Sequence, residues 1–162
     1  MKQQSFSDIE YSHRRRRTKR EEFLDFMNGI VPWDRCIGII RPYYYRNKRG
    51  RKAKNLETML RMYLMQNWFS LSAEGMEDAI YDSYSMRKFL GVNFIDEQVP
   101  DSTTLLRFRR LLEKDRIGEK IMADIADQLK QAGLVLHRGS VTDAAVIPAH
   151  GPVKNKELNQ AE

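Results

Sequence analysis

The chain has 162 residues, of which 41% are hydrophobic, enough for one ordinary hydrophobic core. No apolar stretch approaches the roughly 18 residues that a membrane span requires, and the single cysteine, Cys36, excludes an intramolecular disulfide. The first residues lack the apolar segment of a secretory signal. These features predict a cytoplasmic protein with no membrane partner.

The basic residues are concentrated in the first third of the chain. Residues 1–54 carry 15 Lys and Arg against 6 acids, a net charge of +9, whereas residues 55–162 carry 13 against 16, a net charge of −3. Such an imbalance attracts polyanions, and binding that releases counterions from phosphates weakens with salt. Nucleic acid is the predicted partner, with an anionic membrane surface as the alternative.

Residues 1–17 are polar and end in an arginine run, so we expect an unfolded basic arm. Arg14, Arg15, Arg16 and Arg17 are predicted to contact phosphates without reading sequence; the alternative is a solvated tail. A helix is expected from near Thr18 to before Pro32, because Phe23, Phe26, Met27 and Ile30 form one apolar stripe.

A short helix is predicted from Trp33 to about Ile40, ended by Pro42. The tyrosines 43–45 that follow are more typical of a packed hinge than of base stacking. Next comes a basic loop expected to face phosphate, and its DNA-binding candidates are Lys48, Arg49, Arg51 and Lys52.

Four more helices and a strand are expected downstream. Apolar spacing predicts a core helix from Leu56 to about Phe69 capped by Asn55, and two short helices with Ser72 and Ser85 as N-caps. A helix starting at 100–103 and another at about 116–132 follow, each with one apolar face. Residues 139–147 are predicted to form a single strand.

The helix that starts at 100–103 places Arg107, Arg110 and Lys114 opposite its apolar face, as a recognition helix does. The alternative is an exposed helix in which Arg110 and Lys114 pair with neighbours such as Glu113. Residues 72–91, with Arg87 and Lys88, are a rival helix-turn-helix candidate. We therefore predict a mainly α fold: a compact helical bundle with a helix-turn-helix-like segment, a basic N-terminal arm and a C-terminal orphan strand.

Three stretches of the chain resemble one family. They are KAKNLETMLRMYLMQNWFSLSAEGMEDAIYDSYSMRKFLG (52–91), VPDSTTLLRFRRLLE (99–113) and GLVLHRGSVTDAAVIPAHGPVKNKE (133–157). Their order and spacing are similar to those of the N-terminal part of insertion-sequence-five (InsH-like) DDE transposases. The resemblance implies a DNA-binding domain over residues 18–133, preceded by the arm 1–17, and the start of an RNase H-like catalytic domain over 134–162.

The resemblance also assigns Asp143 as the first aspartate of the DDE triad and a ligand of the catalytic metal once the other two carboxylates are present. Thr142 and Ala145 depart from the residues that the family more often has around it. The implied partners are double-stranded DNA at terminal inverted repeats and a second transposase chain, in a nucleoid-associated bacterial protein.

No residue of the chain matches the second aspartate or the glutamate of the triad. Two metal ions roughly 4 Å apart need at least three converging carboxylates, so we expect a truncated transposase that binds no cofactor and does not cut DNA alone; a complete enzyme would use Mg²⁺. The chain is then either a relic or one half of an enzyme completed by frameshifting or by a second chain. The competing class is a helical RNA-binding or protein-interaction module.

Overall fold

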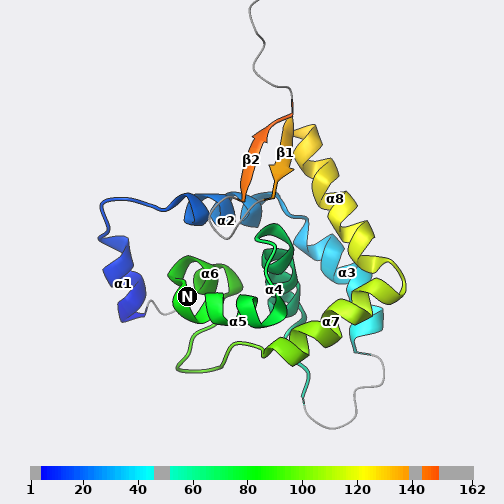
Figure 1. Ribbon diagram of the computed structural model, residues 1–162, viewed down its shortest axis with the longest axis horizontal. Helices are drawn as coiled ribbons and strands as arrows, with labels where there is room; N and C mark the ends of the chain where they lie inside the picture. The colour runs from blue at the N-terminus through cyan, green and yellow to red at the C-terminus, as the bar shows by residue number, and fades with distance from the viewer. Residues whose placement is uncertain (1–4, 46–51, 139–143, 150–162) are drawn as a thin grey trace, which may run out of the picture.

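The computed structural model describes residues 5–45, 52–138 and 144–149. Within them the chain is mainly helical, as predicted, with one small sheet (Figure 1). The elements are α1 (Phe6–Ser12), α2 (Lys19–Ile30), α3 (Trp33–Tyr44), α4 (Leu56–Trp68), α5 (Ala73–Asp82), α6 (Tyr84–Leu90), α7 (Ser102–Lys114), α8 (Ile117–Gln131), β1 (Leu134–His137) and β2 (Ala145–Pro148). None of the helices in these residues is both long and apolar enough to cross a bilayer.

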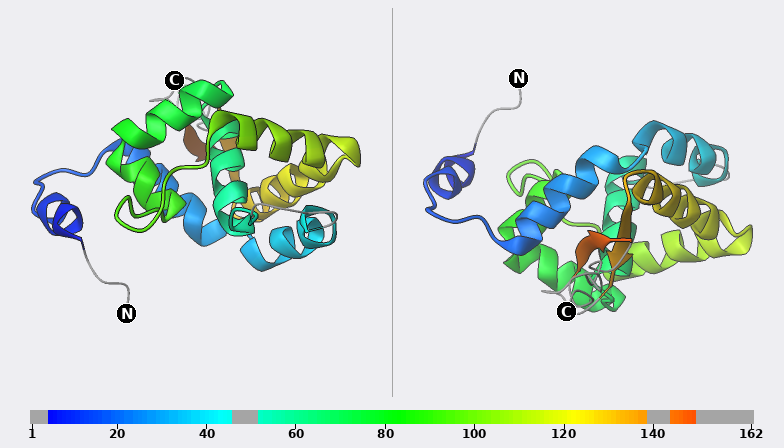
Figure 2. Two further views of the ribbon diagram at one scale, coloured as in Figure 1. Left: turned by 90° about the horizontal axis from the view of Figure 1, so that it is seen from below. Right: turned by 90° about the horizontal axis from the view of Figure 1, so that it is seen from above.

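Helix α4 is the centre of the molecule and contacts α3, α5, α6 and α7. Its predicted cap is confirmed, because the Asn55 side chain accepts a hydrogen bond from the Thr58 backbone N–H at 3.2 Å. The prediction of one apolar face is too narrow, since Met62, Met65 and Gln66 are buried beside the expected core residues. The two further views show α4 enclosed by its neighbours (Figure 2).

The prediction of an unfolded arm is wrong for residues 6–12, which form α1. A capping box holds the first turn: the Ser5 hydroxyl accepts from the Asp8 N–H at 3.2 Å, and the Asp8 carboxylate accepts from the Ser5 N–H at 3.0 Å. The other side of α1 rests on α6, where the rings of Tyr11 and Tyr84 stack 3.8 Å apart. Side-chain contacts therefore offset the entropy of ordering this polar segment.

Two predicted helix boundaries are also wrong. Pro42 does not end α3, which continues to Tyr44 because that side chain is buried and its hydroxyl donates to the Lys54 carbonyl at 2.5 Å. The N-cap of α6 is Ser83 rather than Ser85, and its hydroxyl accepts from the Met86 N–H at 3.3 Å. The cap of α5 at Ser72 and the end of α6 at Gly91 are as predicted.

The strand near the C-terminus is not an orphan. Strand β2 pairs antiparallel with β1, with Val135 opposite Ile147 and Leu136 opposite Val146. Leu136 and Val146 pack against the core and Val135 and Ile147 face outward. Strand β1 alternates between half-buried and exposed residues, whereas β2 is half-buried in its first two residues and exposed in its last two. The sheet lies between α8, which contacts β1, and α2, which contacts β2 (Figure 1).

Candidate nucleic-acid interface

The outer face of α7 presents three cationic side chains. Arg107, Arg110 and Lys114 are all exposed, and among the described residues no hydrogen bond or ion pair engages them. Their spacing of three and four residues places them on one side of the helix. We call this set the α7 stripe, and its predicted exposure is confirmed.

The start and the inner face of α7 are fixed, so the α7 stripe is held on a rigid element. The Asp101 side chain accepts from the Thr104 N–H at 2.7 Å, and the Ser102 N–H donates to the Glu77 carboxylate of α5 at 2.8 Å. Leu105, Phe108 and Leu112 are buried in the core, as predicted. The N-terminal end and the apolar side of the helix are therefore anchored before any ligand arrives.

Glu113 does not neutralise the α7 stripe. Its carboxylate pairs with Arg109 at 3.2 Å, one turn earlier on the same helix. The alternative reading, in which Glu113 pairs with Arg110 or Lys114, is therefore wrong. The charge that Glu113 balances is that of Arg109.

The basic loop predicted between α3 and α4 begins and ends beside α7. The ring of Tyr44 meets that of Phe108 edge-on, with centroids 5.7 Å apart, and Tyr44 also donates to the backbone of Lys54. Burial raises the pKa of Tyr44 to about 12, so its hydroxyl stays protonated as a donor. Lys52 is exposed here, whereas Lys48, Arg49 and Arg51 lie outside the described residues.

Two members of the arginine run contact carboxylates of the same chain. Arg14 pairs with Glu21 at 2.5 Å and lies over the rings of Tyr11 and Tyr84, and Arg17 pairs with Asp25 and Glu21. Arg15 and Arg16 are exposed, and among the described residues neither forms a side-chain hydrogen bond or an ion pair. Two of the four members therefore make ion pairs within the protein, Arg14 half-buried and Arg17 still exposed, and their contact with phosphates stays a prediction.

The cations of the rival candidate, residues 72–91, also contact their own protein. Lys88 lies 3.6 Å from the Glu21 carboxylate. The Arg87 guanidinium lies over the rings of Tyr84 and Phe94, at 5.6 and 4.9 Å. The sequence alone did not predict these partners. The acids and aromatic rings come close to the cations only when the chain folds.

Asp143 lies outside the described residues, so its place in a catalytic site is not seen. The next residue, Ala144, is buried, and β2 begins at Ala145. Among the residues that the structure describes, no three or more His, Cys, Asp or Glu side chains gather in a way that would hold a metal ion. The described residues therefore offer no set of ligands for Mg²⁺.

Comparison with models of protein families matches residues 12–111 to the family described as Transposase domain (DUF772). This match covers more than half of the 162 residues. The chain belongs to the transposase domain family DUF772. Membership agrees with the resemblance to the N-terminal part of insertion-sequence-five transposases and gives the protein a role in transposition.

The DUF772 region runs from the last residue of α1 to residue 111 of α7. It includes Arg107 and Arg110 of the α7 stripe, the loop between α3 and α4, and the arginine run. Helix α8 and the β-hairpin follow it. No solved structure matches the chain.

Proposed function

We propose that this DUF772 protein binds double-stranded DNA at the terminal inverted repeats of an insertion sequence, with the outer face of α7 against the DNA. The observation that carries the proposal is the α7 stripe: three cations on one rigid helix face that form no ion pair with any acid in the described part of the chain. Elsewhere Arg14, Arg17 and Lys88 are already paired with carboxylates.

Within this surface the residues would have two roles. Arg107 and Arg110 lie in the middle of α7, and a guanidinium presents two donors that fit the N7 and O6 acceptors of guanine in the major groove. Lys114 at the end of α7 and Lys52 at the end of the loop are point charges suited to phosphates. Exposed Arg15 and Arg16 would add affinity without sequence preference.

DNA cleavage is not part of the proposal. Phosphoryl chemistry with two metal ions needs at least three converging carboxylates, and Asp143 is the residue of this chain that matches the triad. We infer that these 162 residues recognise DNA and that the chemistry depends on carboxylates supplied in addition to Asp143.

The experiment is a mobility-shift assay on the purified chain with three probes of equal length: the ends of the element, a random duplex and a duplex RNA. We expect the ends to be bound more tightly than the random duplex, and both DNA affinities to fall as salt rises, by roughly 0.9 log unit per log of salt for each phosphate contact. Absence of DNA binding at low salt would contradict the proposal. Tighter binding of RNA than of DNA would favour the RNA-binding class instead.

A further inference from the structure

Leu106 is the apolar residue of α7 that the core does not use. Its side chain is 38% exposed, whereas the remaining apolar residues of the helix are buried or packed against the core: Leu105, Phe108, Leu111 and Leu112. Leu106 is followed by Arg107 and lies about one turn before Arg110, so its side chain borders the α7 stripe. Packing within the described chain therefore does not account for an apolar residue at this position.

Thr103 continues the same face toward the start of α7. It is exposed and lies three residues before Leu106 and four before Arg107. Its side chain offers a methyl group and a hydroxyl. The outer face of α7 thus presents methyl groups next to guanidinium groups, and we call Thr103, Leu106, Arg107 and Arg110 the α7 mixed patch.

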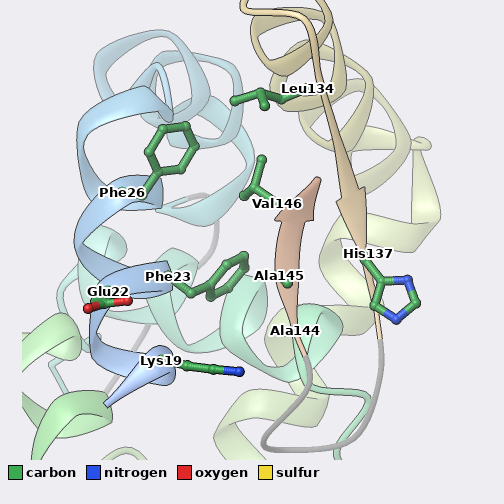
Figure 3. Close-up of a pocket in the computed structure, with 9 residues that line it drawn as sticks. All are labelled: Lys19, Glu22, Phe23, Phe26, Leu134, His137, Ala144, Ala145 and Val146. Atoms are coloured by element: carbon green, nitrogen blue, oxygen red, sulfur yellow. The ribbon is translucent and has the colours of Figure 1, made fainter. Parts of the chain in front are cut away.

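The surroundings of Leu106 differ from those of another exposed apolar side chain, Phe26. Phe26 from α2 and Val146 from β2 line a recess of about 760 Å³ (Figure 3). Lys19 and Glu22 line it as well and carry opposite charges, so charge favours no class of ligand there. Leu106 instead lies beside unpaired cations. A ligand that covers it must combine negative charge with apolar groups.

The two ends of α7 differ in charge. Two backbone N–H groups of its first turn donate to carboxylates, those of Asp101 and Glu77. These acids occupy donors that a phosphate would otherwise use. Lys114 lies at the other end of the helix. The phosphate backbone is therefore favoured near Lys114, which leaves the α7 mixed patch for the edges of the bases.

The major groove of DNA offers both kinds of contact that the α7 mixed patch can make. Thymine presents its C5-methyl group there, and guanine presents the N7 and O6 acceptors that an arginine binds with two hydrogen bonds. A helix that only follows phosphates uses cations and polar groups and gains nothing from a leucine. The combination of Leu106 with two arginines therefore matches a stretch of groove in which thymine lies near guanine.

We propose that Leu106 contacts the C5-methyl group of a thymine in the terminal inverted repeats, within the base pairs that Arg107 and Arg110 reach. This inference rests on the proposed function and adds to it a base that α7 selects. Thr103 lies beside the same contact and extends it toward a neighbouring base pair. Cytosine lacks the methyl group, so the contact discriminates thymine from cytosine.

Replacement of thymine by deoxyuridine tests the contact, because deoxyuridine lacks only the methyl group and keeps the hydrogen-bonding groups of thymine. Each thymine of the element's end is replaced in turn, and the affinity of the full chain for each probe is measured. We expect wild type to lose about fourfold in affinity at one thymine, or at two adjacent ones, which is the size expected for burial of one methyl group. Replacement of the other thymines should leave the affinity unchanged.

Leu106→Ala identifies the residue that makes the contact. The variant should bind the unmodified end about fourfold or more weakly than wild type, and should bind the thymine and deoxyuridine probes equally. Its fold should be intact, because alanine favours a helix and Leu106 lies outside the core. Ile95→Ala is the matched control: Ile95 is 86% exposed in the loop after α6, and this variant should keep the affinity and the deoxyuridine profile of wild type.

Two results overturn the inference and leave the proposed function intact. In the first, wild type binds the ends and tolerates deoxyuridine at every thymine. In the second, Leu106→Ala keeps the deoxyuridine profile of wild type, so that a different residue reads the thymine and Leu106 faces another partner. A chain that binds no DNA contradicts the proposed function itself, and this inference with it.

Discussion

The carboxylate of Glu21 sits at the first turn of α2 with three cations around it. The residue is 4% exposed, and burial alone would raise its pKa. The hydrogen bond and charge of Arg14, helped by Lys88 and Arg17, outweigh that effect and leave the pKa of Glu21 below its usual value. This buried anion explains why Arg14 and Arg17 fold back onto the protein instead of extending toward a ligand.

Replacement of Glu21 by glutamine should remove this attraction. We expect Glu21→Gln to lower the free energy of unfolding at neutral pH by about 1.5–3 kcal/mol, because hydrogen bonds to charged groups are of that size. A lowered folded-state pKa contributes stability that is complete above the ordinary value of 4.5 and is lost as pH falls through the folded value. The deficit of the variant should therefore shrink as the solution is acidified.

Urea unfolding of both proteins from neutral pH to about pH 3 measures this difference. Both should retain some acid sensitivity from Asp8, whose pKa is lowered chiefly by the hydrogen bond from Tyr84. A deficit that stays constant with pH would show that the Glu21 charge does not carry the effect.

At the scale of the helices, signals that act within a few residues were predictable. The caps at Asn55 and Ser72 were predictable, and so was the start of α7 at 100–103, because a side chain that can accept a hydrogen bond stands just before a run of apolar residues at helical spacing. The end of α8 was readable too, since Gly133 takes the left-handed backbone, φ 73°, that glycine adopts without strain.

Elements decided by distant contacts were not predictable. Helix α1 depends on Tyr84, more than 70 residues away in the chain. Strand β1 depends on pairing with β2, and α3 passes Pro42 because Tyr44 is buried against Phe108. For α3 the local sequence is unfavourable, whereas for α1 the Ser5–Asp8 capping box and for β1 the apolar Leu-Val-Leu run are local signals too weak to decide without the tertiary contact.

Two serines near the start of α6 differ in their contribution to the helix: Ser83 is its N-cap, and Ser85 is the cap that the sequence predicted. Ser83 caps the helix and its hydroxyl also accepts from Arg20 Nη1 at 3.1 Å, while the Ser85 hydroxyl forms a hydrogen bond only with the Ser83 hydroxyl among the described residues, at 3.2 Å. We expect Ser83→Ala to cost about 1 kcal/mol of unfolding free energy and Ser85→Ala to cost clearly less. Thermal or chemical unfolding of the two variants checks this, and an equal or reversed order would show that the cap is misplaced.

Over the whole molecule, the basic residues fall into two groups that their order in the chain does not reveal. One group, with Arg14, Arg17, Arg61 and Lys88, is paired with carboxylates of the bundle. The other has no ion pair among the described residues; it includes the α7 stripe and also Lys52, Arg15, Arg16, Lys120 and Lys130, which are all exposed. The stripe was predictable from helical spacing alone, but the neutralisation of half of the arginine run was not, because its acids and rings are brought in by the fold.

If DNA contacts α7, the position of a removed charge should matter for DNA affinity. If a diffuse positive field attracts the DNA, only the number of removed charges should matter. Arg107→Ala/Arg110→Ala and Lys120→Ala/Lys130→Ala remove the same charge, the first pair from the α7 stripe and the second from exposed positions of α8. A diffuse field would weaken equally in both variants, because only the total charge would count.

Affinity for the element's ends and for random DNA, measured side by side for wild type and these two variants, tests the central claim most directly. We predict that the α7 variant loses about tenfold or more in affinity for the ends and most of its preference over random DNA, since a base contact is worth about 1–3 kcal/mol. The α8 variant should stay close to wild type. Equal losses in the two variants would contradict the assignment of α7 as the DNA-binding face.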